Sequence, residues 1–291
     1  MKNSLRIVFM GTPEFAVPSL NILVENNYDV VAVITAPDKP GGRGLQLQPS
    51  EVKKAAEKHG LKILQPTNLK APEFIEELRS LNANLQVVVA FRMLPEMVWA
   101  MPSIGTFNLH ASLLPQYRGA APINWAIING EKETGVTTFF LKHEIDTGSI
   151  LFQEKEPILP ADDAGTLYER LMHKGAQLVL KTVKAIESGD YQPMPQSESG
   201  ELKHAPKIFR ETCMIDWSRK SDDIVNFVRG LSPYPGAWSA INGKTYKIFK
   251  VSKGEGALKM KTADGYVSIE ELQPEGKKRM KASEFLRGYK L

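Results

Sequence analysis

The sequence predicts an α/β protein in which an N-terminal, doubly wound, mostly parallel sheet is joined by a linker to a small C-terminal β-barrel of OB-like form. Two observations carry this prediction. Over roughly the first 150 residues, short β-branched runs alternate with helix-length segments, which is typical of an open parallel sheet. Past residue 207, short strand candidates meet at Asn-Gly and Asp-Gly turns, which indicate a small barrel. We therefore predict domains at residues 1–189 and 208–291, with the linker at 190–207.

The first predicted domain begins with an apolar run at residues 5–10 that is typical of a buried parallel strand. Thr12 is predicted to cap a helix that ends near residue 25. The same criteria predict further strands at 29–35, 63–64, 85–91, 106–112, 135–141 and 150–158, and helices at 51–59, 73–81, 121–130 and 165–188.

The linker is predicted because residues 189–206 are polar, contain three prolines and lack periodicity. Beyond it we expect a helix at 222–230, strands at 237–241, 245–251, 258–262 and 265–272, and a final short helix.

Composition restricts the class of protein. Hydrophobic residues make up 42% and charged residues 24% of the chain, as in ordinary globular proteins. The single cysteine, Cys213, excludes an internal disulfide and a Cys-rich zinc site, and it indicates either a reducing compartment or indifference to redox conditions. There is no apolar run of about eighteen residues, and a strand follows the start almost directly. We therefore expect a cytoplasmic protein with neither a spanning helix nor a signal peptide.

Charge is distributed unevenly along the chain. Residues 208–291 hold 16 Lys and Arg against 10 Asp and Glu, whereas residues 1–207 hold 21 against 23. This asymmetry favours a polyanionic partner for the C-terminal part, with nucleic acid first, although a solvated surface without a partner stays open. The glycine-rich loop at 37–44 carries two basic residues, which suits either an arm that closes on a polyanion or an ordinary surface loop.

The candidate catalytic residues lie between residues 105 and 148. Asn108 and His110 alternate on one strand, so their side chains share a face, and Asp146 follows the next strand in an acidic turn. One imidazole without ligand spacing does not indicate a metal site, and Ser112 lacks a nucleophile-elbow context. An amide and an imidazolium can stabilise the oxyanion of acyl transfer between two amines, while a carboxylate orients the imidazole and accepts a proton. Residues 92–95 follow a predicted central strand, where open α/β sheets place ligand sites.

These residues belong to motifs that resemble a known family. The pattern N-x-H-x-S-L-L-P-x-Y-R-G-x-x-P with a later D-T-G resembles the formyltransferases that use 10-formyltetrahydrofolate. Other motifs are similar to the branch of that family that acts on methionyl-tRNA, and together they extend over nearly the whole chain. They are F-M-G-T-P-E-F, P-D-K-P-x-G-R-G, S-L-L-P-x-Y-R-G-A-A-P-I, I-D-W-S and P-x-P-G-A-W.

The resemblance implies a Rossmann-like catalytic domain, 10-formyltetrahydrofolate as formyl donor, no metal, and initiator methionyl-tRNA as acceptor in translation initiation. No membrane or stable protein partner is implied. Asn108 and His110 would polarise the formyl carbonyl, and Asp146 would support His110 and proton transfer. The residues implied in folate binding are Ser112, Leu113, Leu114, Pro115, Phe91, Arg92, Met93 and Leu94, and those implied in tRNA binding are Lys39, Arg43, Lys277, Lys278 and Arg279.

The chain departs from the family pattern at two places. Arg92 stands where the family often has Gly, and Ile145 stands where it often has Leu. Two alternatives stay open: a sugar-nucleotide formyltransferase, and a tRNA-binding relative without activity.

Overall fold

The computed structural model describes residues 5–41, 46–197 and 200–288. The chain forms two compact units, each assembled from separate segments. The first contains Met1–Pro115, Gly135–Lys155 and Glu169–Glu201, and the second contains Gln116–Thr134, Glu156–Tyr168 and Leu202–Leu291. The boundaries predicted at residues 189 and 207 stay a prediction.

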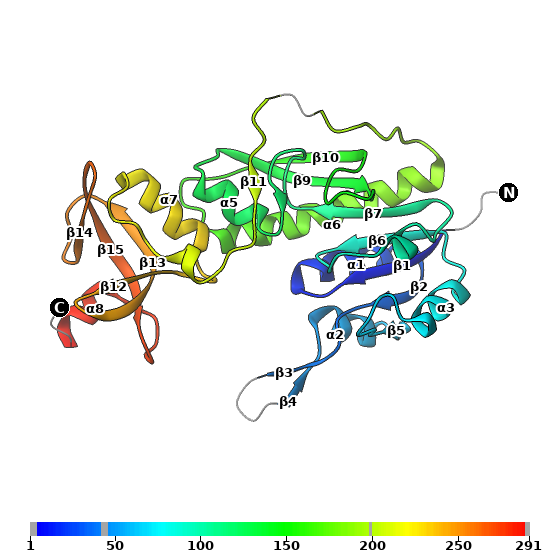
Figure 1. The fold of residues 1–291 in the computed structure, drawn as a ribbon, viewed down its shortest axis with the longest axis horizontal. Helices are drawn as coiled ribbons and strands as arrows, with labels where there is room; N and C mark the ends of the chain where they lie inside the picture. The colour runs from blue at the N-terminus through cyan, green and yellow to red at the C-terminus, as the bar shows by residue number, and fades with distance from the viewer. Residues whose placement is uncertain (1–4, 42–45, 198–199, 289–291) are drawn as a thin grey trace. The chain divides into compact units, whose positions relative to one another are not determined.

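A seven-stranded sheet dominates the first unit, in the order β10-β9-β7-β6-β1-β2-β5 (Figure 1). The pairs β1–β2, β1–β6, β2–β5 and β6–β7 are parallel, whereas β7–β9 is antiparallel. The predicted mostly parallel, doubly wound architecture is thus confirmed. The strands are β1 (Arg6–Gly11), β2 (Asp29–Ile34), β5 (Ile63–Leu64), β6 (Leu85–Val89), β7 (Gly105–His110), β9 (Glu133–Phe140) and β10 (Ile150–Pro157).

The helices that accompany this sheet are α1 (Val17–Glu25), α2 (Glu51–Lys58), α3 (Pro72–Ser80), α4 (Glu96–Trp99) and α6 (Ala164–Ser188). A 3-10 turn at Glu14–Ala16 precedes α1, and its N-cap is Pro13 with no side-chain cap. The prediction that Thr12 caps this helix is therefore wrong, because the chain enters it through a tighter turn. β3 (Lys39–Gly41), within the predicted glycine-rich loop, pairs antiparallel with β4 (Gln46–Gln48), which follows that loop, and neither strand was predicted.

The two faces of the sheet have different partners. On one face Val8, Met10 and Val88 pack in a core with residues of α3 and α4. On the other face α6 approaches closely: a methyl group added at Gly175 would lie 2.7 Å from Leu109 Cδ2. Thr138 of β9 shares a 2.8 Å hydrogen bond with Thr182 of α6. Side chains alternate along β7, so Asn108 and His110, on either side of Leu109, face away from α6.

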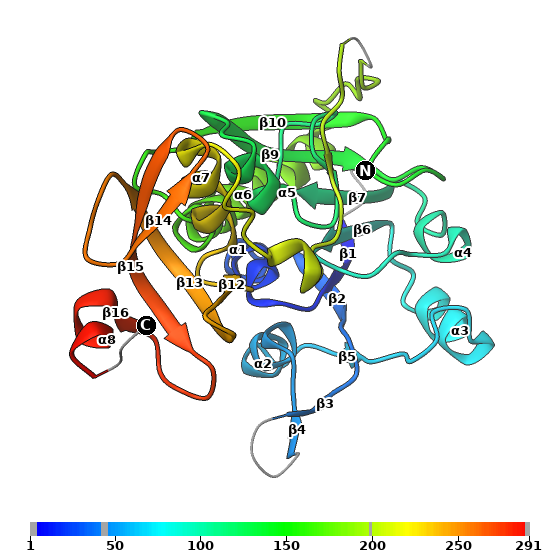
Figure 2. The same cartoon turned by 60° about the vertical axis from the view of Figure 1, so that its left-hand side comes forward.

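Antiparallel strands build the sheet of the second unit, in the order β12-β13-β15-β14 with β16 paired to β15 (Figure 2). Its core joins these strands to α5 and α7, with Phe285 and Leu272 fully buried. The elements are β8 (Arg118–Gly119), α5 (Pro122–Ile128), β11 (His204–Ala205), a 3-10 turn (Glu211–Cys213), α7 (Ser221–Leu231), β12 (Ala237–Ile241), β13 (Lys244–Lys253), β14 (Lys259–Thr262), β15 (Gly265–Pro274), β16 (Met280–Lys281) and α8 (Ala282–Gly288).

The Tyr-Arg-Gly motif has a packing role in this unit. β8 pairs in parallel with β11, and a methyl group added at Gly119 would lie 2.4 Å from the carbonyl oxygen of Ala205. Tyr117 is buried and donates a 2.5 Å hydrogen bond to Glu131. Burial, followed by this bond to a carboxylate, raises the pKa of Tyr117. Gly119 and Tyr117 are therefore explained by local packing in the second unit.

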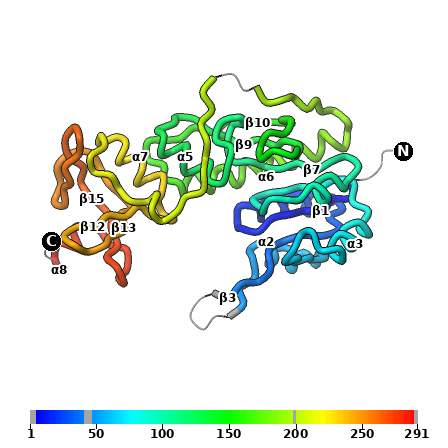
Figure 3. Tube along the Cα trace, in the orientation of Figure 1, coloured from blue at the N-terminus to red at the C-terminus, as the bar shows by residue number. Residues whose placement is uncertain are grey.

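The Cα trace in Figure 3 follows the chain through both units. Among the residues that the structure describes, no helix has both the length and the apolar character needed to cross a bilayer.

Candidate active site

Strand β7 places the first two candidate catalytic residues. Asn108 pairs with Val88 of β6 on one side and with Phe139 of β9 on the other, and His110 pairs with Thr137. The His110 side chain is 7% exposed, whereas Asn108 is half-buried. Across the described ranges, no hydrogen bond of the Asn108 side-chain amide to another residue is found, so this amide can donate to a ligand. The prediction that the two side chains share a face is confirmed.

Asp146 reaches His110 from the turn between β9 and β10. Its Oδ2 lies 3.8 Å from Nδ1 of His110, and its side chain is only 12% exposed. Its φ of 56° lies in the left-handed region, which an Asp tolerates better than most residues. The structure thus brings the predicted His110 and Asp146 together, with the carboxylate directed at one ring nitrogen.

The turn between β9 and β10 does not begin beside His110, because the end of β9 does not lie next to the end of β7. Because β9 runs antiparallel to β7, its last residue, Phe140, pairs with Phe107 near the start of β7. The chain therefore leaves β9 three residues away from the level of His110. Residues 141–149 must return along the face of β7 to bring the carboxylate to the imidazole. We call these residues the carboxylate turn.

The carboxylate turn is tightly packed where it closes on β9. Its two ends meet where Phe140 N–H donates a 2.9 Å hydrogen bond to Ser149 O. A methyl group added at Gly148 would lie 1.6 Å from the carbonyl oxygen of Phe140. The side-chain amide of Gln196 donates to Asp146 O at 2.7 Å and to Gly148 O at 2.9 Å. His143 within the turn lies 3.2 Å from Glu96 of α4.

The segment predicted to bind folate, residues 112–115, continues directly from β7. Thr137 of β9 donates a 2.6 Å hydrogen bond to Ser112 O and accepts one of 3.2 Å from Leu114 N. Gln153 of β10 donates to Leu114 O at 2.8 Å and to Thr137 Oγ1 at 3.0 Å. Leu113 packs where Gly135 leaves room, because a methyl group there would lie 2.5 Å from Leu113 Cδ2. Two strands of the sheet therefore fix this segment.

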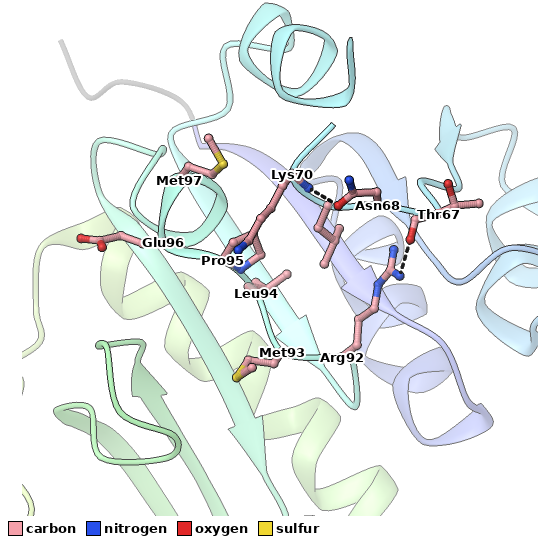
Figure 4. A pocket seen from close by; sticks show the side chains of 10 residues that line it. Thr67, Asn68, Lys70, Arg92, Met93, Leu94, Pro95, Glu96 and Met97 are labelled. Carbon is pink, nitrogen blue, oxygen red and sulfur yellow. Dashed lines mark hydrogen bonds between the residues drawn. The ribbon is translucent and has the colours of Figure 1, made fainter. Parts of the chain in front are cut away.

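The second predicted folate segment, Phe91–Leu94, follows β6. Three of its residues, Arg92, Met93 and Leu94, line a cavity of about 940 Å³ together with Thr67, Asn68, Leu69, Lys70, Pro95, Glu96 and Met97 (Figure 4). Phe91 is not among these lining residues and packs against the core beneath α3 and α4. Met93 is 76% exposed.

Arg92 is exposed, but its guanidinium is bound by neighbouring loops. Its guanidinium donates to the carbonyl oxygens of Thr67, at 3.0 Å, and Pro66, and it lies 5.7 Å from the centre of the Phe91 ring. The arginine that replaces the family's glycine thus ties the loop after β6 to the loop after β5. Figure 4 shows the bond to Thr67 at one side of the cavity.

The residues predicted to bind tRNA lie in both units. Lys39 is exposed on β3, and Arg43 lies outside the described residues. Lys277 and Lys278 are exposed in the turn before β16. The Arg279 side chain forms an ion pair of 2.5 Å with Glu271 and stacks 4.5 Å from the Phe249 ring centre, so this arginine is already engaged within its own unit.

Sequence reasoning missed Thr137, Gln153 and Gln196, whose side chains fix residues 112–115 and the carboxylate turn. Each acts through a contact distant in sequence, so no local pattern marks it. Over residues 5–41, 46–197 and 200–288, no group of three or more His, Cys, Asp or Glu side chains is placed to hold a metal ion.

Solved structures share this fold at low sequence identity. The N-formyltransferase from Helicobacter canadensis, in complex with folinic acid and dTDP-3-aminofucose, has a TM-score of 0.70 at 23% identity, covering 91% of this chain and 99% of that chain. HypX from Aquifex aeolicus in complex with tetrahydrofolic acid has a TM-score of 0.67 at 20% identity, covering 98% of this chain and 47% of that chain. These likenesses show the fold.

Sequence relatives are much more similar. The methionyl-tRNA formyltransferase of Bacteroides fragilis is 53% identical, covering 100% of this chain and 97% of the relative. That of Flavobacterium johnsoniae is 50% identical, covering 98% and 96%. The family models for formyl transferase and for its C-terminal domain match residues 5–183 and 207–290. The chain therefore belongs to the methionyl-tRNA formyltransferases of the formyl transferase family.

Proposed function

We propose that the chain transfers the formyl group of 10-formyltetrahydrofolate to the α-amino group of methionine on initiator methionyl-tRNA, with Asn108, His110 and Asp146 as the catalytic residues. The observation that carries this proposal is the buried His110, 3.8 Å from a carboxylate and beside a half-buried amide on the same face of β7. Family membership over the full chain favours this acceptor over a sugar nucleotide and over an inactive tRNA-binding protein.

The chain offers a site that fits the formyl donor. 10-Formyltetrahydrofolate supplies a formyl group on a nitrogen that can leave. The cavity of about 940 Å³ beside Met93 and Leu94 is within the usual size for small-molecule sites, and it combines apolar surface with the cations of Lys70 and Arg92. Aromatic rings and carboxylates of a folate match that lining. Residues 112–115 and 92–94 would hold the donor.

Asn108 and His110 would act on the carbonyl oxygen that gains negative charge during transfer. Nδ1 of His110 faces Asp146, and the imidazole and the Asn108 amide would both donate hydrogen bonds to that oxygen. Low exposure of His110 strengthens such interactions because water screens them less. Loss of one such donor typically costs about 10²–10³ in rate.

Asp146 would have two roles that its position allows. Its carboxylate orients the His110 ring, and it accepts, directly or through water, the proton that the attacking amine loses. The remaining acceleration would come from holding two large substrates together. Lys39, Arg43, Lys277 and Lys278 would contact tRNA phosphates, and we place the reaction in the cytoplasm, without a stable protein partner.

The test is a turnover assay with 10-formyltetrahydrofolate and charged initiator tRNA, followed by hydrolysis and detection of formylmethionine. Asn108→Ala, His110→Ala and Asp146→Ala should each lower turnover by roughly 10²–10³ while keeping the fold. His173→Ala, which changes an exposed histidine on α6, is the matched control and should leave turnover unchanged. Near-normal turnover by one of the three variants would remove that residue from the mechanism.

Two further measurements separate the alternatives. A steep loss of tRNA affinity between low and moderate salt is expected for an acceptor held by many phosphates, and a flat response would favour a small nucleotide acceptor. Absence of formylmethionine even at high concentrations of the unmodified protein would favour a tRNA-binding protein without activity.

A further inference from the structure

The chain beyond α6 is bound to the hairpin that carries Asp146. The Tyr191 ring lies 6.0 Å from the Phe140 ring at the end of β9. Met194 exchanges two backbone hydrogen bonds with Ile150 at the start of β10, of 2.7 and 2.9 Å. Gln196 then reaches the carboxylate turn itself. We call residues 191–197 the post-helix segment; it belongs to the same compact unit as the turn.

Gln196 holds the turn at two points with one nitrogen. Its Nε2 donates to Asp146 O at 2.7 Å and to Gly148 O at 2.9 Å, on either side of Thr147. A primary amide carries two hydrogens on this nitrogen, so each carbonyl oxygen can receive its own bond. A side chain of similar length without a donor cannot replace this contact.

The turn needs such a hold because its conformation is demanding. Asp146 has a φ of 56°, and Gly148 lies so close to Phe140 O that no side chain fits there. The Asp146 carboxylate is 3.8 Å from His110 Nδ1, slightly beyond direct hydrogen-bond range in the absence of substrates. A shift of about 1 Å in such a group can cost about 10²-fold in rate.

We propose that Gln196 is a positioning residue for formyl transfer: its amide fixes the backbone on both sides of Thr147 and so keeps the Asp146 carboxylate beside His110. This inference rests on the proposed function of Asp146. It also gives the first part of the predicted linker a role within the first unit, since the hydrogen bonds that hold the carboxylate turn come from Gln196.

The first experiment compares Gln196→Met with Gln192→Met in the full chain. Methionine has nearly the same length but no donor, and Gln192 is an exposed residue of the same segment, which makes it the matched control. Gln196→Met should lower kcat about 10- to 100-fold while the KM for tRNA and for folate stays within about twofold. Gln192→Met should match the unmodified protein. An unchanged kcat for Gln196→Met, or a rise in KM alone, would overturn the inference.

The second experiment asks whether Gln196 acts through Asp146. In an Asp146→Ala background, measured under single-turnover conditions, Gln196→Met should cause no further loss, because the carboxylate that it positions is already gone. A further loss equal to that in the unmodified background would show an independent role and would sink the proposal. A merely structural contribution would give that additive result.

A rescue variant covers the case in which Gln196→Met reduces stability. The ammonium of Gln196→Lys carries three donors and can reach both carbonyl oxygens, so this variant should recover most of the lost kcat. Recovery no better than that of Gln196→Met, with both variants folded by thermal melting, would contradict positioning by these hydrogen bonds. If the unmodified protein makes no formylmethionine, the proposed function fails instead.

Discussion

Two of the irregular segments in the first unit that carry candidate site residues are each held by a glutamine. Residues 112–115 receive hydrogen bonds from Gln153, which reaches Leu114 O and Thr137 Oγ1. The carboxylate turn receives two from Gln196. The chemistry of the hold is the same, because an amide group supplies two donors in both cases.

The two glutamines lie in different kinds of local structure. Gln153 lies on β10 and is assisted by Thr137, a fully buried residue of β9, so residues 112–115 depend on the sheet. Gln196 belongs to a segment without helix or strand beyond α6. Residues 112–115 should therefore keep their geometry as long as the sheet is folded, whereas the carboxylate turn can be displaced while the sheet stays intact.

Gly148→Ala should separate the two segments most strongly. The added methyl would lie 1.6 Å from Phe140 O, a backbone atom, so the carboxylate turn must move. We expect kcat to fall by about 10²-fold or more, with folate binding retained. Turnover assays and folate titration measure the two effects. Gly288→Ala, where an added methyl meets nothing within 4 Å, is the control. Normal kcat for Gly148→Ala would show that the position of the turn does not matter.

Thr137→Val should act on the other segment and on stability. It removes the donor to Ser112 O and leaves Leu114 N–H without this partner in a buried setting, which costs about 1–3 kcal/mol. Denaturant unfolding should show this loss, together with weaker folate binding. Thr138→Val is the matched control, because Thr138 is equally buried and bonded to Thr182 on the α6 side. Equal loss of folate binding in both variants would contradict a specific role for Thr137.

Gln153→Met should have the smallest effect. Leu114 and Ser112 keep their bonds to Thr137, so only one of two supports is lost. We expect a loss of about 0.5–1.5 kcal/mol in stability and a KM for folate raised a few-fold at unchanged kcat. Gln196→Met is expected to show the opposite division, with kcat lowered and KM retained. The same kinetic pattern in both variants would remove the distinction between the two segments.

Much of the fold was accessible from local pattern. The apolar β-branched runs and the turn dipeptides predicted the longer strands of both units to within a few residues, but not the short strands β3, β4, β8, β11 and β16. Alternation along β7 predicted the shared face of Asn108 and His110. Thr12 was predicted as a helix cap, but the 3-10 turn at Glu14–Ala16 overrides that local preference. The four-residue helix α4 is too short to give a periodic signal.

The missed parts of the site depend on tertiary contacts. The antiparallel direction of β9 decides where the carboxylate turn begins, and no local pattern in the sequence of β9 predicts that direction. Gln196 is 50 residues from Asp146 in the chain, in a segment whose composition predicts only a linker. Arg92 departs from the family pattern, and its side chain is bound by the carbonyl oxygens of Pro66 and Thr67, which are distant in the sequence.

The route of the carboxylate turn makes it a tether whose length sets the reach of its acid. Phe140 and Ser149 close this turn at the level of Phe107, whereas His110 lies three residues further along β7, about 10 Å at the usual rise of a strand. Residues 141–148 must cover this distance along β7 and still place the Asp146 carboxylate 3.8 Å from His110 Nδ1. A deletion between Phe140 and Ser149 would shorten the available chain by about 3.3–3.6 Å for each residue removed, while every catalytic side chain stays in the sequence. The number of residues in this interval is therefore part of the active site, as their identity is.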